Sequence, residues 1–240
     1  MNENKLNLTD IDLLIEEAKK INFSSEPEIR NLVKKYPKNF KEVGSLNENS
    51  LIEYLKKDED YDKSKEIDSI TLLYKTLLIK RKIHCTDLGK GMVLKNLPGW
   101  KAIKDNNIYH KSHIIAKELG GQRTYSSLSK YYNGFIGTEH ANVGRNGNSG
   151  MRCIEGVIRE HLCENENNYI VYECRVIYKR PKDIIPIFIV IIIVSGDYLI
   201  NKIYFVWNIQ LGYTINYKNG DYSPFKTSTF SNILDSLHYM

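Results

Sequence analysis

The sequence predicts an α+β protein in which an N-terminal helical region precedes a mostly antiparallel sheet. Apolar residues recur at helical spacing through the first third of the 240-residue chain. Beyond residue 85 the pattern changes to glycine-containing turns and to alternating or β-branched apolar runs, which favour strands. We therefore predict two regions, a helical one over 1–84 and a sheet-containing domain over 85–240.

The helical region is marked by start and stop signals. Thr9 with Asp12 resembles a capping box, and Ser25 precedes a second amphipathic segment. The last predicted helix, also the longest, leads into the basic stretch 80–82, which either contacts phosphate or forms a solvated helix end. The predicted helices run from Thr9 to Ile21, from Ser25 to Pro37, over 51–55 and over 67–78.

The second region reads as strands around one helix. The run over 184–194 is the most apolar part of the chain, but its eleven residues are too few for a membrane helix, which needs about 20. Its proline and its β-branched residues favour a buried strand instead. Strands are predicted over 108–113, 169–178, 184–194, 203–209 and 213–217, with helices over 151–162 and from about Thr229.

Charge and cysteine usage narrow the class of protein. The net charge is +5, and the whole excess lies in residues 85–240, with 18 basic against 13 acidic side chains. A mildly basic domain suits a polyanion, although a random surface excess explains it equally.

The four cysteines form no CxxC pair, which argues against a zinc knuckle. Free thiols are the default, and the even count also permits one disulfide. The polar start lacks a signal-peptide core, so we expect a cytoplasmic location or export by a non-standard route.

A histidine and two asparagines form the candidate site. His113 ends an extended segment, a glycine pair follows at 120–121, and Asn133 and Asn142 come next. A histidine can act as a base near pH 7, and an asparagine oxygen is a hard ligand suited to Mg²⁺. Each residue taken singly is more often structural. In combination they indicate metal-assisted hydrolysis of phosphodiester bonds.

This part of the chain resembles the DNA/RNA non-specific endonucleases. These are ββα-metal (His-Me finger) enzymes, which include streptococcal secreted DNases and bacterial toxin nucleases. The resemblance covers roughly 85–222, and its motifs are 97–101, Tyr109–Ile115, Leu119–Gly121, Asn133, Gly137–Thr138, Asn142–Val143, Gly150–Met151, Glu155 and Asn216–Gly220.

The resemblance implies a ββα-metal nuclease domain that cleaves DNA, and also RNA, with little sequence preference. It implies Mg²⁺ as the metal, with Mn²⁺ as a substitute, and products with 5′-phosphate and 3′-hydroxyl ends. His113 takes the position of the general base and Asn142 that of the metal ligand. Asn133 is expected to position water or loop backbone, and Glu155 to hold a metal-bound water.

Basic residues near these positions are candidates for binding substrate phosphates. Lys111 stands where the family has an arginine, which keeps the charge but loses the bidentate fork. Further phosphate candidates are Arg123, Arg145 and Arg152. The sequence departs from the family pattern at His110, Ser112 and Glu139, and these departures leave both the base and the ligand in place.

Two other readings remain open. The first is a catalytically inactive nucleic-acid-binding module, which would bind DNA without cleaving it. The second is a toxin effector whose N-terminal helices bind an inhibitor or a delivery partner.

Overall fold

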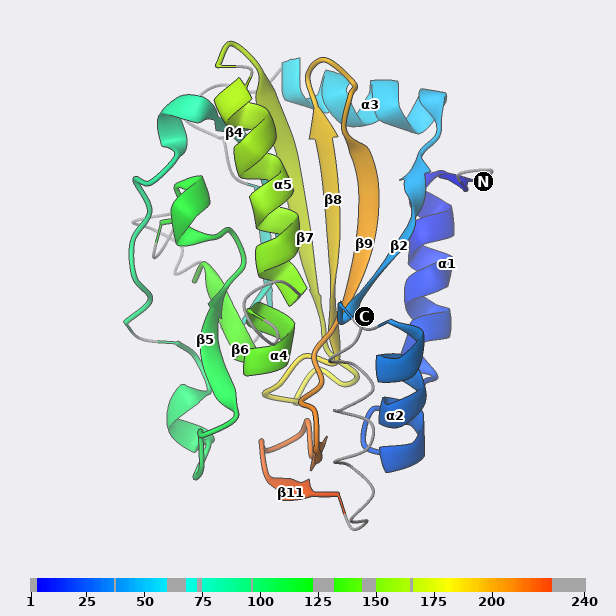
Figure 1. The fold of residues 1–240 in the computed structure, drawn as a ribbon, viewed down its shortest axis with the longest axis vertical. Helices are drawn as coiled ribbons and strands as arrows, with labels where there is room; N and C mark the ends of the chain where they lie inside the picture. The colour runs from blue at the N-terminus through cyan, green and yellow to red at the C-terminus, as the bar shows by residue number, and fades with distance from the viewer. Residues whose placement is uncertain are drawn as a thin grey trace.

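The structure, a computed structural model, describes residues 4–36, 38–59, 68–72, 75–95, 97–122, 132–143, 150–164 and 166–225 (Figure 1). Its helices are α1 (Leu8–Lys19), α2 (Glu26–Lys35), α3 (Glu48–Glu59), α4 (Glu139–Asn142) and α5 (Gly150–Glu164), with short 3-10 turns η2 (Cys85–Asp87), η3 (Trp100–Ala102) and η4 (Lys117–Leu119). Its strands are β1 (Lys5–Leu6), β2 (Phe40–Leu46), β3 (Asp68–Leu72), β4 (Lys75–His84), β5 (Tyr109–His113), β6 (Gly134–Thr138), β7 (Tyr169–Ile177), β8 (Phe188–Ser195), β9 (Asn201–Trp207), β10 (Tyr213–Ile215) and β11 (Tyr222–Pro224).

One large sheet organises the molecule. Within the described residues it has seven strands in the order β1-β2-β9-β8-β7-β4-β3. Neighbouring strands are antiparallel except for β1 and β2, which are parallel. This confirms the predicted α+β class and the mostly antiparallel sheet. The hairpins β5–β6 and β10–β11 form two small separate sheets.

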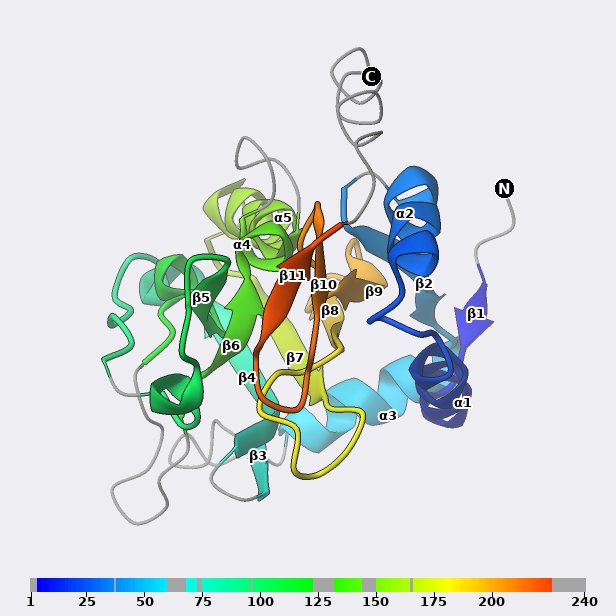
Figure 2. The same ribbon diagram turned by 90° about the horizontal axis from the view of Figure 1, so that it is seen from below.

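Both faces of the sheet are covered, and side-chain alternation along β8 shows it. Phe188, Val190 and Ile192 belong to a core shared with α1, α2 and α3, whereas Ile189 and Ile191 belong to a core shared with α5. Every residue of β8 is therefore buried, which explains its unbroken apolar sequence. Figure 2 shows α5 on one side of the sheet and α1 and α3 on the other.

The longest predicted helix is wrong, because this part of the chain folds as the strands β3 and β4. β4 pairs with β7 along seven residues, from Leu78 opposite Arg175 to His84 opposite Tyr169. The leucines and isoleucines of this stretch fit both a helical and an extended period, and pairing with β7 decides between the two. Residues 67 and 73–74 of the predicted helix lie outside the described residues.

The basic stretch that follows has partners within the molecule. Lys80 and Lys82 lie over the rings of Tyr54 and Tyr169, at 3.7 and 4.1 Å from the ring centres. Arg81 forms an ion pair of 2.9 Å with Asp87. This stretch is part of strand β4, so the interpretation as a solvated helix end is wrong, while contact with phosphate stays a prediction.

The other helices are close to their predicted positions. The first begins one residue earlier than predicted, and its capping box joins Asn7 to Asp10 instead of Thr9 to Asp12. Ser25 is the N-cap of α2, and α3 is longer than the segment predicted for it. The helix predicted from Thr229 lies outside the described residues.

Two further findings bear on the class of protein. Among the described residues no helix combines the length and the apolar character needed to cross a membrane. All four cysteines are described and carry free thiols; Cys174 is buried and Cys163 is exposed.

The predicted boundary after residue 84 falls at the end of β4. Strands from its two sides are hydrogen-bonded to each other, since β2 pairs with β9 and β4 pairs with β7. The apolar residues of α1 and α2 are buried against the same sheet.

Candidate active site

His113 is the last residue of β5, where the hairpin with β6 holds it opposite Gly134. Its Nε2 lies 3.0 Å from the backbone oxygen of Met92. A carbonyl oxygen only accepts, so Nε2 carries the proton and Nδ1 is left with a free lone pair. Burial lowers the pKa of His113; Lys117 acts in the same direction, while the Met92 carbonyl and Glu118 oppose the shift. The imidazole is therefore neutral at pH 7 and able to accept a proton.

Asn142 ends the short helix α4, which follows β6 directly. Thr138 caps this helix, since its hydroxyl oxygen accepts from the Ala141 N–H at 3.0 Å. The same hydroxyl donates to the Ile209 oxygen at 2.7 Å, and so ties α4 to the segment after β9. The side-chain Nδ2 of Asn142 lies 3.3 Å from Nδ1 of His110.

Glu155 lies on α5, at the edge of the apolar side of the helix. Met151, Ile154 and Ile158 pack onto the sheet, which leaves Glu155 half-buried beside the site. Burial raises the pKa of Glu155 to about 7, with the neighbouring Glu118 adding to the rise and Arg152 opposing it.

These side chains line one cleft of about 800 Å³. Of the residues predicted from the sequence, it contains His113, Asn142, Glu155 and Arg152. The structure thus brings the proposed base and the proposed metal ligand to the same polar opening. The cleft also contains charged residues that the sequence interpretation missed: Lys38, Lys117, Glu118, Arg159 and Glu160.

Some of the missed residues had a signal in the sequence and some had none. Arg159 lies four residues after Glu155 and seven after Arg152, both of which were predicted, and this spacing places all three on one face of a helix. Glu118 lies only five residues after His113, so its place near the proposed base could have been expected from the sequence. Lys38 had no such signal, because it reaches the cleft only through folding; its backbone oxygen accepts from the N–H of Gly150, the first residue of α5, at 2.8 Å.

Asn133 is not in the cleft. It is fully buried, and both ends of its amide bond the backbone of Ile115: Oδ1 accepts from the N–H and Nδ2 donates to the oxygen, each at 2.8 Å. Of the two tasks predicted for it, this geometry matches holding loop backbone. Gly121 packs against the hydrogen bonds between Asn133 and Ile115, and an added Cβ at Gly121 would meet the Ile115 oxygen at 1.9 Å.

Lys111 is not among the residues that line the cleft. Lys111 donates to the backbone oxygen of Lys95 at 3.0 Å, and its ammonium lies 5.1 Å from the centre of the Trp100 ring. Arg123 and Arg145 lie outside the described residues.

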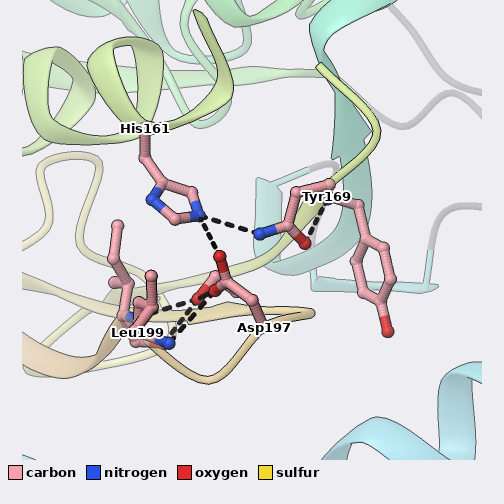
Figure 3. A network of polar contacts seen from close by, with 7 residues as sticks. His161, Tyr169, Asp197 and Leu199 are labelled. Carbon is pink, nitrogen blue, oxygen red and sulfur yellow. Dashed lines mark hydrogen bonds and ion pairs between the residues drawn. The ribbon is translucent and has the colours of Figure 1, made fainter. Parts of the chain in front are cut away.

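The last turn of α5 is tied to the sheet by a polar network (Figure 3). His161 Nε2 lies 3.0 Å from Asn168 Nδ2 and 3.4 Å from Asp197 Oδ2. Asp197 in turn accepts from the Ser195 hydroxyl at 2.5 Å and from the Leu199 N–H at 3.1 Å. The helix that carries Glu155 is thereby fixed to the turn between β8 and β9.

The donor atoms of the cleft suit a hydrated, hard cation. Within the described part of the chain, no group of three or more His, Cys, Asp or Glu side chains is placed to hold a metal ion. The cleft instead offers the amide of Asn142, with Glu118 and Glu155 as further oxygen donors. Mg²⁺ favours oxygen ligands and gives up its water reluctantly, so a site with few protein ligands fits it.

The sequence is similar to that of a known nuclease. It is 31% identical over 146 residues to a deoxyribonuclease of Streptococcus dysgalactiae subsp. equisimilis, a match that covers 60% of this chain and 42% of that protein. The chain thus spans less than half the length of this curated relative. No protein-family model matches the sequence.

The fold is similar to those of solved nucleases. Sda1 nuclease with bound zinc ion has a TM-score of 0.60 at 18% identity, covering 81% of this chain and 99% of that one. NucA from Streptococcus agalactiae with no metal bound has a TM-score of 0.58 at 18% identity, covering 84% and 97%. Its structure with magnesium ion bound has a TM-score of 0.50 at 18% identity, covering 69% and 83%.

Together these findings confirm the resemblance to the DNA/RNA non-specific endonucleases. At 18% identity the solved structures show a shared fold, and the similarity in sequence is to a streptococcal deoxyribonuclease.

Proposed function

We propose that this chain is a divalent-metal-dependent endonuclease that hydrolyses phosphodiester bonds of DNA, with RNA as a second substrate. The observation that carries the proposal is the shared cleft of His113 and Asn142, in which the histidine keeps an unprotonated Nδ1. The similarity to a deoxyribonuclease supports the same class of reaction.

In this proposal His113 is the general base. Its Nδ1 takes a proton from the water that attacks phosphorus, while the Met92 carbonyl holds the ring through Nε2. The lowered pKa keeps the base form populated at neutral pH. Asn133 acts indirectly, because its bonds to Ile115 fix the backbone that leaves His113.

Asn142 would hold the cation through Oδ1, and Glu155 would bind water in the cation's shell. When bound, Mg²⁺, or Mn²⁺ as a substitute, supplies positive charge that offsets the charge developing on the phosphate. Arg152, Arg159 and Lys38 line the same cleft and would bind the phosphates of the substrate backbone.

Plasmid digestion with and without metal tests this function. We expect cleavage with Mg²⁺ or Mn²⁺ and none with EDTA. His113→Ala should lower the rate by about 10²–10⁴-fold, the usual contribution of a general base. His84→Ala is the matched control, since His84 lies on β4 and is not among the cleft residues.

Each contrary outcome is informative. A His113→Ala variant as active as the wild type would remove the proposed base. Salt-sensitive DNA binding without cleavage by the wild type would favour the inactive binding module over the enzyme.

A further inference from the structure

One side chain bonds the proposed metal ligand and is absent from the roles given so far. The Nδ2 of Asn142 lies 3.3 Å from Nδ1 of His110. An amide nitrogen has no lone pair to offer, so Asn142 donates and the His110 nitrogen accepts.

The backbone around this contact is fixed. His110 pairs with Gly137 across the β5–β6 hairpin, and Tyr109 pairs with Thr138, the N-cap of α4. The first N–H of α4, from Glu139, donates to the oxygen of Ile108 at 3.1 Å. His110 therefore stands on the hairpin and Asn142 on the short helix that continues from it, and backbone hydrogen bonds join the two elements.

The contact decides which end of the amide faces the cleft. The two ends of an asparagine amide are alike in size, but only the oxygen can bind a cation. An acceptor that holds Nδ2 leaves Oδ1 on the other side of the side chain. Because Asn142 lines the cleft, that other side is the one open to a cation.

We propose that His110 is a positioning residue that holds the Asn142 amide with its oxygen toward the metal. This inference rests on the proposed function. It adds that metal affinity depends on a hydrogen-bond acceptor at position 110, a residue that itself does not line the cleft. Without that acceptor the amide is free to turn, and its NH₂ group would then face the cation.

Mn²⁺ binding tests the inference without any need for cleavage. The free-ion EPR signal of Mn²⁺ is followed during titration of the full chain. His110→Phe keeps a planar ring but has no acceptor, and we expect it to bind Mn²⁺ about 10–100-fold more weakly, as for other residues that orient metal ligands. His110→Asn carries an acceptor close to the position of Nδ1, and we expect it to restore binding to near the wild-type level.

Several controls separate the outcomes. Thermal unfolding without metal shows whether His110→Phe is folded, and His110→Ala replaces it if the larger ring disturbs the hairpin. Cleavage measured against Mg²⁺ concentration should show a higher metal requirement for His110→Phe with a similar maximal rate.

The two proposals fail differently. Wild type that binds no Mn²⁺, or Asn142→Ala that binds it as wild type does, would overturn the metal site itself. If Asn142→Ala loses binding but folded His110→Phe keeps it, or if His110→Asn is as weak as His110→Phe, the positioning role is wrong.

Discussion

The two nitrogens of His113 have different surroundings, and this difference sets how the base would titrate. Nε2 donates to a backbone carbonyl, which fixes the ring and the position of its proton. A carbonyl carries no full charge, so it opposes the effect of burial only in part, and the pKa of His113 stays lowered. A lowered pKa keeps the imidazole neutral into more acidic solution.

The pH profile of cleavage follows from this direction. The base must be unprotonated, so activity falls as the pH drops through the pKa of His113. Since that pKa is lowered from 6.5, we expect the midpoint of the acid limb below pH 6.5. Initial rates from pH 4.5 to 8.5 at saturating Mg²⁺ measure it.

Glu155 needs a control in this experiment, because burial also places its pKa in the range of the assay. Glu155→Gln removes that titration, and the acid limb that remains in this variant belongs to His113. A midpoint above 6.5 in Glu155→Gln would contradict the assignment.

Single residues also show what the sequence can reveal about the site. His113 and Asn142 were predictable because a hairpin followed by a short helix fixes their spacing within about thirty residues. For Asn133 the sequence predicted two alternative roles and could not decide between them. An asparagine that binds backbone and one that binds water are the same residue type, and only the fold separates the two cases. Lys38 was not predictable, because it lies more than seventy residues before the rest of the site.

Among the elements, α5 depends on a close approach to α4. Gly150 begins α5 with φ +65°, and a Cβ there would lie 2.4 Å from the Ala141 oxygen in α4. Only glycine combines this backbone conformation with this contact. The proposed metal ligand Asn142 directly follows Ala141, so the spacing of the two helices also sets the shape of the candidate site.

A pair of glycine substitutions on α5 tests this dependence. Gly150→Ala should lower the free energy of unfolding by at least about 1–2 kcal/mol from the left-handed backbone alone, and it should also weaken cleavage. In Gly156→Ala the added Cβ meets nothing within 4 Å, so we expect a gain of up to about 1 kcal/mol. Urea unfolding measures both variants. Equal stability of the two would show that the α4–α5 contact is dispensable.

Elements differ in how far the sequence predicted them. α5 and β8 were recognisable because one has apolar residues only at helical spacing and the other is apolar throughout. β4 was not, since its leucines and isoleucines fit both periods. Its structure depends on β7, which lies about ninety residues later in the chain.

On the scale of the whole molecule, the first 84 residues supply strands as well as helices. β2 and β4 pair with β9 and β7, and α1, α2 and α3 pack over a core that includes Phe188 and Val190. A partner that binds these helices, as the toxin reading requires, would meet their outer faces, which are mainly polar but expose Leu13 on α1 and Ile52 on α3.

Removal of residues 1–84 tests whether the remainder is a domain by itself. We expect the chain that starts at residue 85 to lose cooperative thermal unfolding and all cleavage, because one face of the sheet would lose its helices and become an exposed apolar surface. A chain that starts at residue 4 is the control and should behave as the full one. A truncated chain that unfolds cooperatively and cuts DNA would support a separate nuclease domain instead.

The pairing of β2 with β9 has a consequence for the newly made chain. Phe40 lies opposite Val206 in the sheet, so β2 cannot pair with β9 until some 160 further residues have been synthesised. At ordinary rates of synthesis this takes roughly 8–30 s. During that time the nascent chain has an unpaired strand edge and exposed apolar helix faces, both of which favour aggregation. We therefore expect chaperone binding to matter most in this interval.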